Sequence, residues 1–442
     1  MFMAAYMKLK RGTSVPLFFT RYFLKKFTLI NSIILNKYCT KHSHGSKLMI
    51  IILLRCFMYL RIILLVVAMF LSSCGGGGSS SSSQNTDQPS PVIIYDTLRD
   101  AAETKSNIFV GSLYNDGYMQ HNDNSATYRT ELARHFNMMS LEYSISMEEI
   151  WKDENTIDFS RPDAAFDYAR ANNIAVRVTH LIWHSTIPEW LSAGSYSDAE
   201  VESLVQGYVT TVMNHYITNY PDVYTEWNVI NEAVSNDSPT ELRNTFFLQK
   251  LGSDYIAKAF QWAGAVSSSA KLYINDYGCI GSSNWNKSRK TTLVGVVNDL
   301  ISRDIRIDGI GFQGHFSIDQ YEEDINDIRL DFADYADLGI ELAFTELDIR
   351  INDNLSGQNI SKEQIQEDFY KNIYQLCIDT PECKSVSLWG LADHLSFMNT
   401  GYASWLAQSE DWPLLIDENM QTKDVYDVIL EILAGNSSRH RV

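Results

Sequence analysis

Between residues 96 and 436, short runs rich in β-forming residues alternate with longer stretches of helical periodicity. The stretch from Asp254 to Ala265, for example, carries apolar residues at helical spacing. Such alternation is typical of βα units, in which helices connect parallel strands. Eight strands of this kind fit a closed (β/α)8 TIM barrel, an α/β fold, better than an open sheet. The predicted strands are Ile108–Gly111, Phe136–Leu141, Ala175–Leu181, Glu226–Val229, Lys271–Asn275, Gly309–Gln313, Glu341–Thr345 and Ser385–Trp389.

A barrel of this kind carries its functional residues on the loops that follow the carboxyl ends of the strands. Here those positions bring carboxylates, imidazoles, amides and indoles to one rim. Aromatic faces stack on pyranose rings, and amides and acids bind hydroxyl groups, so this rim suits a sugar. The rim residues are Glu142, Trp183, His184, Asn231, Glu232, Asp276, Tyr277, His315, Glu346, Asp348, Trp389 and Asp393.

Two glutamates stand out on this rim. Glu232 follows Asn231 after the fourth predicted strand, and Glu346 follows Thr345 at the end of the seventh. On one barrel rim they can face each other across a cleft, although 114 residues separate them in the sequence. Two carboxyl groups suffice to break a glycosidic bond, and a separation of about 5–5.5 Å gives retention of configuration.

The succession of motifs resembles glycoside hydrolase family 10, the β-1,4-xylanase family, from about Leu98 onward. WNVINEA (Trp227–Ala233) looks like the family's acid/base motif, and TELDI (Thr345–Ile349) looks like its nucleophile motif. FNMMSLE, WHSTIPEWL, KLYINDYG, IDGIGFQGHF, WGLAD and PLLID are also similar, in the family's order. The resemblance implies a retaining hydrolase of internal β-1,4-xylosidic bonds that acts on a polysaccharide and needs no metal or other cofactor.

The resemblance also implies residue roles. Glu232 would be the general acid and then the base, and Glu346 would attack the anomeric carbon. Asn231 would bind the sugar 2-hydroxyl. His315 would hydrogen-bond Glu346, with Asp348 orienting the imidazole. Substrate-binding or supporting roles are further implied for Glu142, Trp183, His184, Gln313 and Trp389.

Five positions depart from the family's pattern, all on the glycone side of the cleft. Tyr143 and Ser146 stand where the family has Asn and Lys. Thr179, Thr186 and Phe397 stand where it has His, Gln and Trp. We therefore hypothesise that the enzyme binds the glycone differently from other family members, in a way suited to a decorated or mixed-linkage xylan or another β-glycan.

A histidine, His180, is next to Thr179, but strand alternation predicts that it points to the opposite face unless a bulge intervenes.

The alternatives to altered specificity are an ordinary xylanase of lower affinity, a β-glucan or β-mannan hydrolase, and a weakly active or inactive surface glycan-binding protein on the same scaffold.

The N-terminal region is typical of an export signal. Met58 to Ser73 combine one arginine, an apolar run and small residues, as in a signal peptide. The segment from Leu71 to Cys74 resembles a bacterial lipobox, which predicts cleavage before Cys74 and acylation of its sulfur; an ordinary signal peptide cut nearby is the alternative. Gly75 favours an outer-membrane anchor, and hence a secreted lipoprotein at the cell surface.

Four segments follow from these patterns. Residues 1–73 form the export region, in which 1–48 resemble an over-extended gene start. Residues 74–95 hold the lipidated cysteine and a flexible Gly/Ser linker. The barrel over 96–436 is the single catalytic domain, and residues 437–442 are a C-terminal tail.

The cysteines and the net charge of the chain indicate which disulfide it can form and which partners it does not bind. Cys377 and Cys383 can close a small loop, and many family members carry a disulfide there; two buried free thiols are the alternative. Cys279 resembles a lone thiol. From Cys74 onward the chain has 25 basic and 54 acidic residues, so it repels nucleic acid and anionic lipid. We expect a monomer without a metal site.

Overall fold

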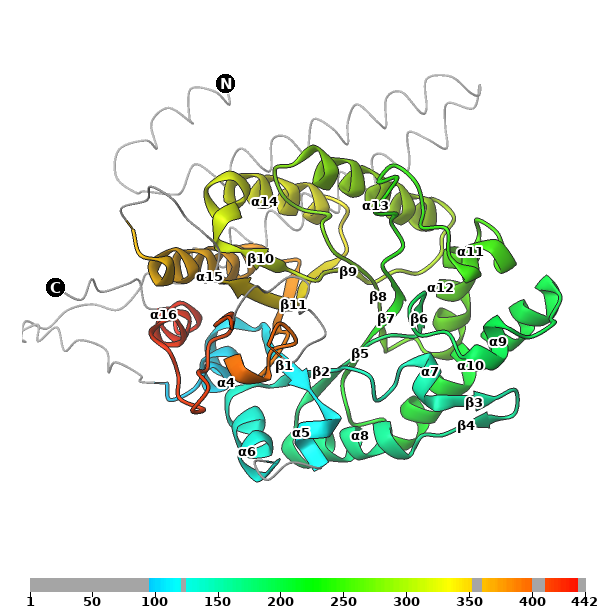
Figure 1. Ribbon diagram of the computed structural model, residues 1–442, viewed down its shortest axis with the longest axis horizontal. Helices are drawn as coiled ribbons and strands as arrows, with labels where there is room; N and C mark the ends of the chain where they lie inside the picture. Colours follow the sequence, from blue (N-terminus) through cyan, green and yellow to red (C-terminus); the bar gives the residue numbers. More distant parts are fainter. Residues whose placement is uncertain (1–94, 121–124, 352–359, 400–409, 436–442) are drawn as a thin grey trace, which may run out of the picture. The chain divides into compact units, whose positions relative to one another are not determined.

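The computed structural model describes residues 95–120, 125–351, 360–399 and 410–435. Eight parallel strands form a ring with helices around its outside (Figure 1). The barrel strands are β1 (Phe109–Tyr114), β2 (Met138–Leu141), β5 (Ala175–Val178), β7 (Thr225–Asn231), β8 (Lys271–Asp276), β9 (Gly309–Phe312), β11 (Glu341–Arg350) and β12 (Cys383–Leu388). Because β1 pairs with both β2 and β12, and β9 with both β8 and β11, the ring is closed. The prediction of an α/β fold, a (β/α)8 TIM barrel, is confirmed.

Each predicted strand overlaps an observed one, but several ends differ, among them those of β5 and β11. β5 ends at Val178 rather than at Leu181. β11 runs on to Arg350, because its second half pairs with the short strand β10 (His315–Ser317). This extension places Glu346 and Asp348 on one strand, whose register against β12 shifts between Phe344 and Leu347.

Three of the long helices that cover the barrel begin at a serine whose side chain accepts a hydrogen bond from a free backbone N–H group. Ser197 closes a capping box with Glu200, and Ser283 and Ser361 cap two later helices. The longer helices are α6 (Ser125–His135), α8 (Ser160–Asn172), α10 (Asp198–Asn219), α12 (Tyr255–Val266), α13 (Asn284–Ser302), α14 (Tyr321–Ala336), α15 (Lys362–Asp379) and α16 (Asp424–Leu433). The helix predicted from Asp254 to Ala265 is α12.

Shorter elements lie in the connections between the barrel strands and the long helices. β3 and β4 form an antiparallel pair, and β6 pairs with β7 beside the rim. These elements are α4 (Leu98–Ala101), the π-helix η1 (Ala102–Ser106), α5 (Asp116–Gln120), α7 (Met147–Ile150), β3 (Trp151–Asp153), β4 (Thr156–Ile157), β6 (Ile182–Trp183), α9 (Glu189–Ser192), α11 (Phe246–Leu251), and the 3-10 helices η2 (Ile318–Gln320) and η3 (Asp393–Leu395).

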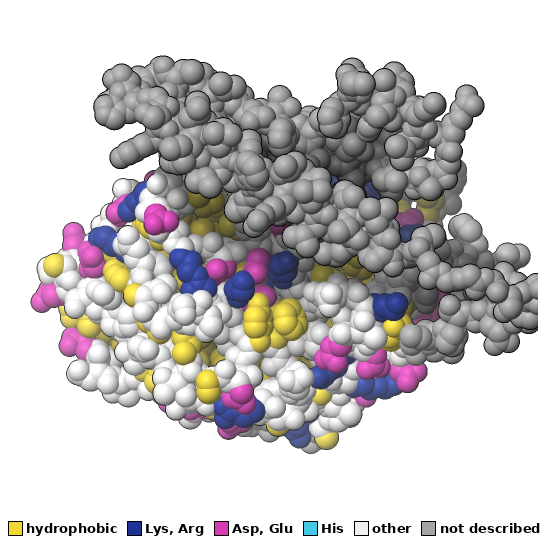
Figure 2. Space-filling view, turned by 180° about the vertical axis from the view of Figure 1, so that it is seen from behind, with side chains coloured by type: hydrophobic (Ala, Val, Ile, Leu, Met, Phe, Trp, Pro, Cys, Tyr) yellow, Lys and Arg dark blue, Asp and Glu magenta, His cyan; other side chains and the backbone are white. Residues whose placement is uncertain are grey.

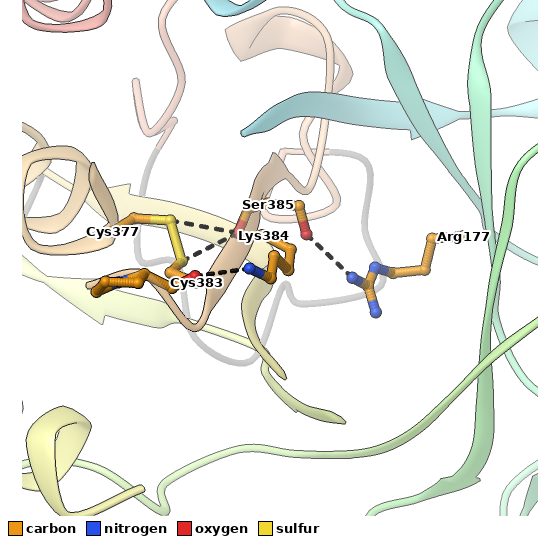
Figure 3. The surroundings of a disulfide bond; sticks show 6 residues. Arg177, Cys377, Cys383, Lys384 and Ser385 are labelled. Carbon is orange, nitrogen blue, oxygen red and sulfur yellow. Dashed lines mark hydrogen bonds between the residues drawn. A yellow bond between two sulfur atoms is a disulfide. The ribbon is translucent and has the colours of Figure 1, made fainter. Parts of the chain in front are cut away.

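The interior of the barrel contains a buried charged network. Arg177 on β5 is fully buried and pairs with Glu226 on β7. Its guanidinium also donates to Asn228 Oδ1 at 3.2 Å and across the barrel to Ser385 Oγ at 3.1 Å (Figure 3). A buried charge needs such partners, so the network ties β5, β7 and β12 together.

A disulfide joins Cys377, near the end of α15, to Cys383, the first residue of β12 (Figure 3). The predicted pairing is confirmed. Cys279 is buried and is the free cysteine of the described residues, as the sequence predicts.

The predicted export region, the acylated Cys74, most of the linker and the tail over 437–442 lie outside the described residues. In the described part of the chain, each helix is too short or too polar to cross a bilayer. Lys and Arg side chains are interspersed with Asp and Glu on the face seen from behind (Figure 2).

Candidate active site

The carboxyl ends of the barrel strands surround a cleft of about 830 Å³. Most of the predicted site residues line it: Glu142, Trp183, Asn231, Glu232, Gln313, His315, Glu346 and Trp389. His184 and Asp348 stand behind this surface, each beside one lining residue. His184 Nε2 is 4.0 Å from Glu232 Oε2, and Asp348 Oδ2 is 3.0 Å from His315 Nδ1.

Glu346 is the more deeply buried of the two glutamates. Its side chain is 6 % exposed, against 14 % for Glu232. Asn275 Nδ2 donates to Glu346 Oε1 at 2.9 Å, and His315 Nε2 lies 3.3 Å from Oε2. Burial raises the pKa of Glu346, and the hydrogen bond and charge of His315 oppose that rise.

His315 is held between two carboxylates. Burial alone lowers the pKa of this imidazole, but the charge and hydrogen bond of Asp348, together with those of Glu346, outweigh burial and raise the pKa to about 10. At neutral pH the ring is therefore a cation, and both ring nitrogens donate. A fixed positive charge beside Glu346 favours the ionised carboxylate that a nucleophile requires.

Glu232 follows β7 in a conformation that side chains rarely adopt, with φ of 57°. Its backbone N–H donates to the carbonyl of Asn275 at 2.8 Å, and its carbonyl accepts from Arg243 Nε at 3.1 Å. The side chain accepts from Gln313 Nε2 at 3.1 Å. Backbone strain of this kind persists only where several surrounding contacts hold it, so the hydrogen bonds to its backbone and to its side chain fix Glu232 in place.

Asn275 links the two glutamates, although no role for this residue followed from the sequence. Its side-chain Nδ2 donates to Asn231 Oδ1 at 2.8 Å as well as to Glu346, and its side-chain Oδ1 accepts from Thr345 Oγ1. Gly311 makes room for this side chain, since a Cβ there would lie 2.3 Å from Asn275 Oδ1. The only signal in the sequence that could have indicated this role was an amide side chain at the end of an otherwise apolar predicted strand.

The expectation that His180 points away from the site is wrong. β5 ends at Val178, so strand alternation does not extend to residue 180. His180 lines the cleft, with Nε2 4.0 Å from Glu346 Oε1. Burial lowers the pKa of His180 to about 3, so the ring is neutral.

Three buried polar atoms at the cleft have no hydrogen-bond partner among the described residues: Asn231 Nδ2, Trp183 Nε1 and His180 Nε2. Buried donors are normally satisfied, so these three mark positions where a hydroxyl-rich ligand would bind.

The five departures on the glycone side fall into two groups. Tyr143 and Phe397 line the cleft, and the Phe397 ring is 5.2 Å from the His315 ring. Ser146, Thr179 and Thr186 are buried outside the cleft lining, and the hydroxyl oxygens of the first two have no partner in the part of the chain that the structure describes.

Glu142 stands on the same side of the cleft. Asn115 Nδ2 donates to Glu142 Oε2. Burial raises the pKa of Glu142 to about 7 although this hydrogen bond opposes the rise. The carboxyl therefore changes its charge near neutral pH.

The residues of the chain match one family, described as "Glycosyl hydrolase family 10", from 97 to 432. The chain belongs to glycosyl hydrolase family 10. It is 31% identical over 309 residues to Endo-1,4-beta-xylanase A of Thermoanaerobacterium saccharolyticum (68% of this chain, 25% of the relative). It is 32% identical over 308 residues to Exoglucanase XynX of Acetivibrio thermocellus (68% and 26%). The chain spans about a quarter of the length of these two relatives.

A solved structure in this family is similar along nearly its whole length. The crystal structure of xylanase 10B from Thermotoga petrophila RKU-1 in complex with xylobiose has a TM-score of 0.69 and 26% identity, covering 78% of this chain and 98% of that one. In the described part of the chain, no group of three His, Cys, Asp or Glu residues is arranged to hold a metal ion.

Proposed function

We propose that this protein is an endo-acting β-1,4-xylanase that cleaves xylan with retention of configuration. The observation that carries the proposal is the contrast between two glutamates of one cleft. Glu346 is buried against a cationic His315, whereas Glu232 is more exposed and meets the neutral amide of Gln313. Two carboxyl groups in different environments are the requirement for separate nucleophile and acid roles.

The reaction has two steps. Glu232 gives its proton to the glycosidic oxygen while a Glu346 oxygen bonds to the anomeric carbon, and the leaving chain departs as an alcohol. Glu232, now a carboxylate, then takes a proton from water as that water displaces Glu346 and releases the sugar. Asn231 Nδ2, which has no partner within residues 95–120, 125–351, 360–399 and 410–435, is the donor available to the 2-hydroxyl.

Product analysis tests this proposal. Linear xylan and xylo-oligosaccharides should yield short products, and NMR of the first-formed product should detect the β-anomer. Glu346→Ala is the control and should release nothing under the same conditions. An α-anomer as first product would exclude the retaining mechanism.

We further propose that the enzyme takes a glycone other than plain xylose units. Support comes from Tyr143 and Phe397 in the cleft lining, and from the loss of charged and amide groups at neighbouring positions. A lost charged hydrogen bond costs about 1.5–3 kcal/mol, so turnover of plain xylo-oligosaccharides should be poor. A kcat/KM on these substrates that is ordinary for a xylanase would contradict the proposed change in glycone preference, but it would not contradict the proposed xylanase activity.

A hydrolase of β-glucan is the second candidate, because one of the relatives is named an exoglucanase. A panel of β-glucan, β-mannan, plain xylan and decorated xylan ranks these substrates directly. Binding without hydrolysis of any of them would favour a glycan-binding protein.

We also propose that Cys74 anchors the enzyme to the outer membrane and that the catalytic domain is monomeric. Expression of the full chain in a Gram-negative host tests the anchor. Cys74→Ser should move the protein from the membrane fraction to the soluble fraction. Light scattering of a Cys74→Ser protein tests the monomer.

A further inference from the structure

A second pocket, of about 610 Å³, lies outside the active-site cleft. Residues from the first two turns of α15 and from the start of α16 line it, together with Ile351 after β11 and Asp393 in η3. The two helices lie side by side (Figure 1). Arg350 lines the cleft and the next residue, Ile351, lines this pocket, so the two hollows adjoin each other across the end of β11.

Trp412 is an exposed aromatic residue of this pocket. It is 42% exposed. Two other aromatic residues of the described chain are similarly exposed: Tyr143 lines the active-site cleft, and Tyr224 stacks on Phe109 with ring centroids 5.1 Å apart. An indole in a pocket offers a large apolar face to a ligand, and its N–H adds a polar contact at the edge. Trp412 is therefore suited to bind a molecule that has flat apolar faces and polar edges.

The backbone of Trp412 is held by three hydrogen bonds. Its N–H donates to Asp411 Oδ1 at 2.8 Å. Its carbonyl accepts from Gln366 Nε2 at 2.8 Å and from Lys423 Nζ at 2.9 Å. Asp411 Oδ1 also accepts from the N–H of Ile351 at 2.8 Å, which ties this segment to the end of β11. Because the backbone is fixed before a ligand arrives, only two side-chain torsions of the indole lose freedom on binding.

The polar groups of the pocket indicate the kind of ligand. Four carboxylates line it: Glu363, Glu367, Asp417 and Asp424. Lys423 is the only basic side chain of the described lining, and its ammonium already contacts Asp393 Oδ2 at 3.1 Å and donates to the carbonyls of Trp412 and Leu414. A pocket with this balance of charge repels phosphate and acidic polymers. Its carboxylates can accept hydrogen bonds from the hydroxyl groups of an uncharged sugar.

We propose that Trp412 and the groups around it form a second polysaccharide-binding site, which holds an uncharged β-linked glycan chain beside the active-site cleft. The inference rests on the proposed function for the identity of this polymer. A long polymer can occupy both hollows, and its second contact is then intramolecular, which strengthens binding overall. A short oligosaccharide that fills the cleft gains nothing from the second site. The site therefore favours long chains over short ones.

Binding without turnover is the first test. Affinity electrophoresis of the Glu346→Ala protein, in gels that contain soluble linear xylan, measures the affinity for the polymer. In this background Trp412→Ala should weaken the affinity about threefold to tenfold. Trp412→Phe keeps a smaller ring and should cause a smaller loss in the same direction. In gels with carboxymethylcellulose, an acidic β-glycan, Trp412→Ala should leave the mobility unchanged.

Kinetics of the active enzyme give the second readout. Trp412→Ala should lower kcat/KM on long xylan by a similar factor and leave kcat/KM on an aryl xylobioside at the wild-type value. Leu330→Ala is the matched control, because this residue of α14 is 66% exposed and lies outside the lining of both hollows; it should change neither value. A merely structural role of Trp412 would lower the melting temperature and reduce the activity on both substrates together.

The possible outcomes separate this inference from the proposed function. Equal affinity for xylan with and without Trp412→Ala would overturn the inference, and Trp412→Phe decides by the same criterion if the alanine variant does not fold. A stronger effect of Trp412→Ala in gels with chitosan, a cationic β-glycan, would overturn the assignment of an uncharged ligand. Failure of the wild-type enzyme to cleave any xylan, with binding that still depends on Trp412, would overturn the proposed function and leave the second site in place.

Discussion

The Nε2 atom of His315 lies 3.3 Å from Oε2 of Glu346, on a ring that Asp348 keeps positively charged. Burial alone would push Glu346 toward its neutral form, which cannot attack an anomeric carbon. The imidazolium offsets this effect without becoming part of the reaction. The pair thus shows how a buried carboxyl can stay ionised, as the proposed role of Glu346 requires.

This pairing predicts a shift in the pH profile. Glu346 must be ionised, so activity falls as the pH drops through its pKa. His315→Gln keeps a donor but removes the charge, which raises the pKa of Glu346 further. The acid limb of kcat/KM should move upward by about one pH unit or more. Asp348→Asn, which weakens the charge on His315, should move it in the same direction; an acid limb unchanged in both variants would contradict the prediction.

Removal of Glu232 should affect substrates according to their leaving group. A dinitrophenyl leaving group departs without a proton, whereas xylan needs one. Glu232→Ala should lower kcat on xylan by about 10²–10⁴-fold, while bond cleavage in a dinitrophenyl xylobioside, followed as a burst, stays fast. Glu346→Ala serves as the comparison and should abolish the burst, because no covalent intermediate can form.

Glu142 should make stability depend on pH. Its pKa in the folded protein, about 7, is raised above the ordinary value of 4.5. The stability that this carboxyl contributes is therefore fully present below about pH 4.5 and is lost as the pH rises through 7. Glu142→Gln does not titrate, so its melting temperature should rise relative to wild type between pH 5 and pH 8. Glu148→Gln, at an exposed glutamate of α7, is the matched control; equal behaviour of the two variants would argue against this account.

The disulfide should stabilise the barrel without affecting catalysis. Cys377 and Cys383 enclose a short loop at the start of β12, outside the cleft. Replacing both by alanine should lower the free energy of unfolding by about 2 kcal/mol, as expected for so short a loop. Denaturant unfolding measures this, and kcat on xylan should stay at the wild-type value. A reducing agent should destabilise the wild type by a similar amount and leave the double variant unaffected.

Much of the fold could be predicted because alternating strands and helices follow from local sequence. Each barrel strand was found, since a strand buried on both faces is a continuous apolar run. The ends were less certain: β11 continues to Arg350 because of its pairing with β10, and that pairing is not local. The predicted direction of His180 was wrong for a similar reason, because it depends on the residue at which β5 ends.

The sequence predicted the site residues whose own side chains carry the proposed chemistry. It did not predict residues that support the site through contacts with other residues. Glu232 and Glu346 were singled out because each comes at the end of an apolar strand, and the structure places both in one cleft; their catalytic roles remain predictions. Asn275, Arg243 and Arg289 act through partners on other loops, which a linear pattern does not reveal. The left-handed backbone of Glu232 could not be predicted either, because it depends on the hydrogen bond that Glu232 donates to β8 and on the one that it accepts from Arg243.

The contacts of Arg289 bear on any attempt to transplant the loop after β8 into another barrel. The guanidinium is carried by α13 but binds the carbonyls of Val234 and Ser235, just after Glu232. A chimera that received only residues 277–289 would import the arginine with the carbonyl of Tyr277 but without these two carbonyls and without Asp276. Grafting both loops together is the minimum unit of exchange, so this part of the cleft wall and the backbone next to Glu232 are inherited as one module.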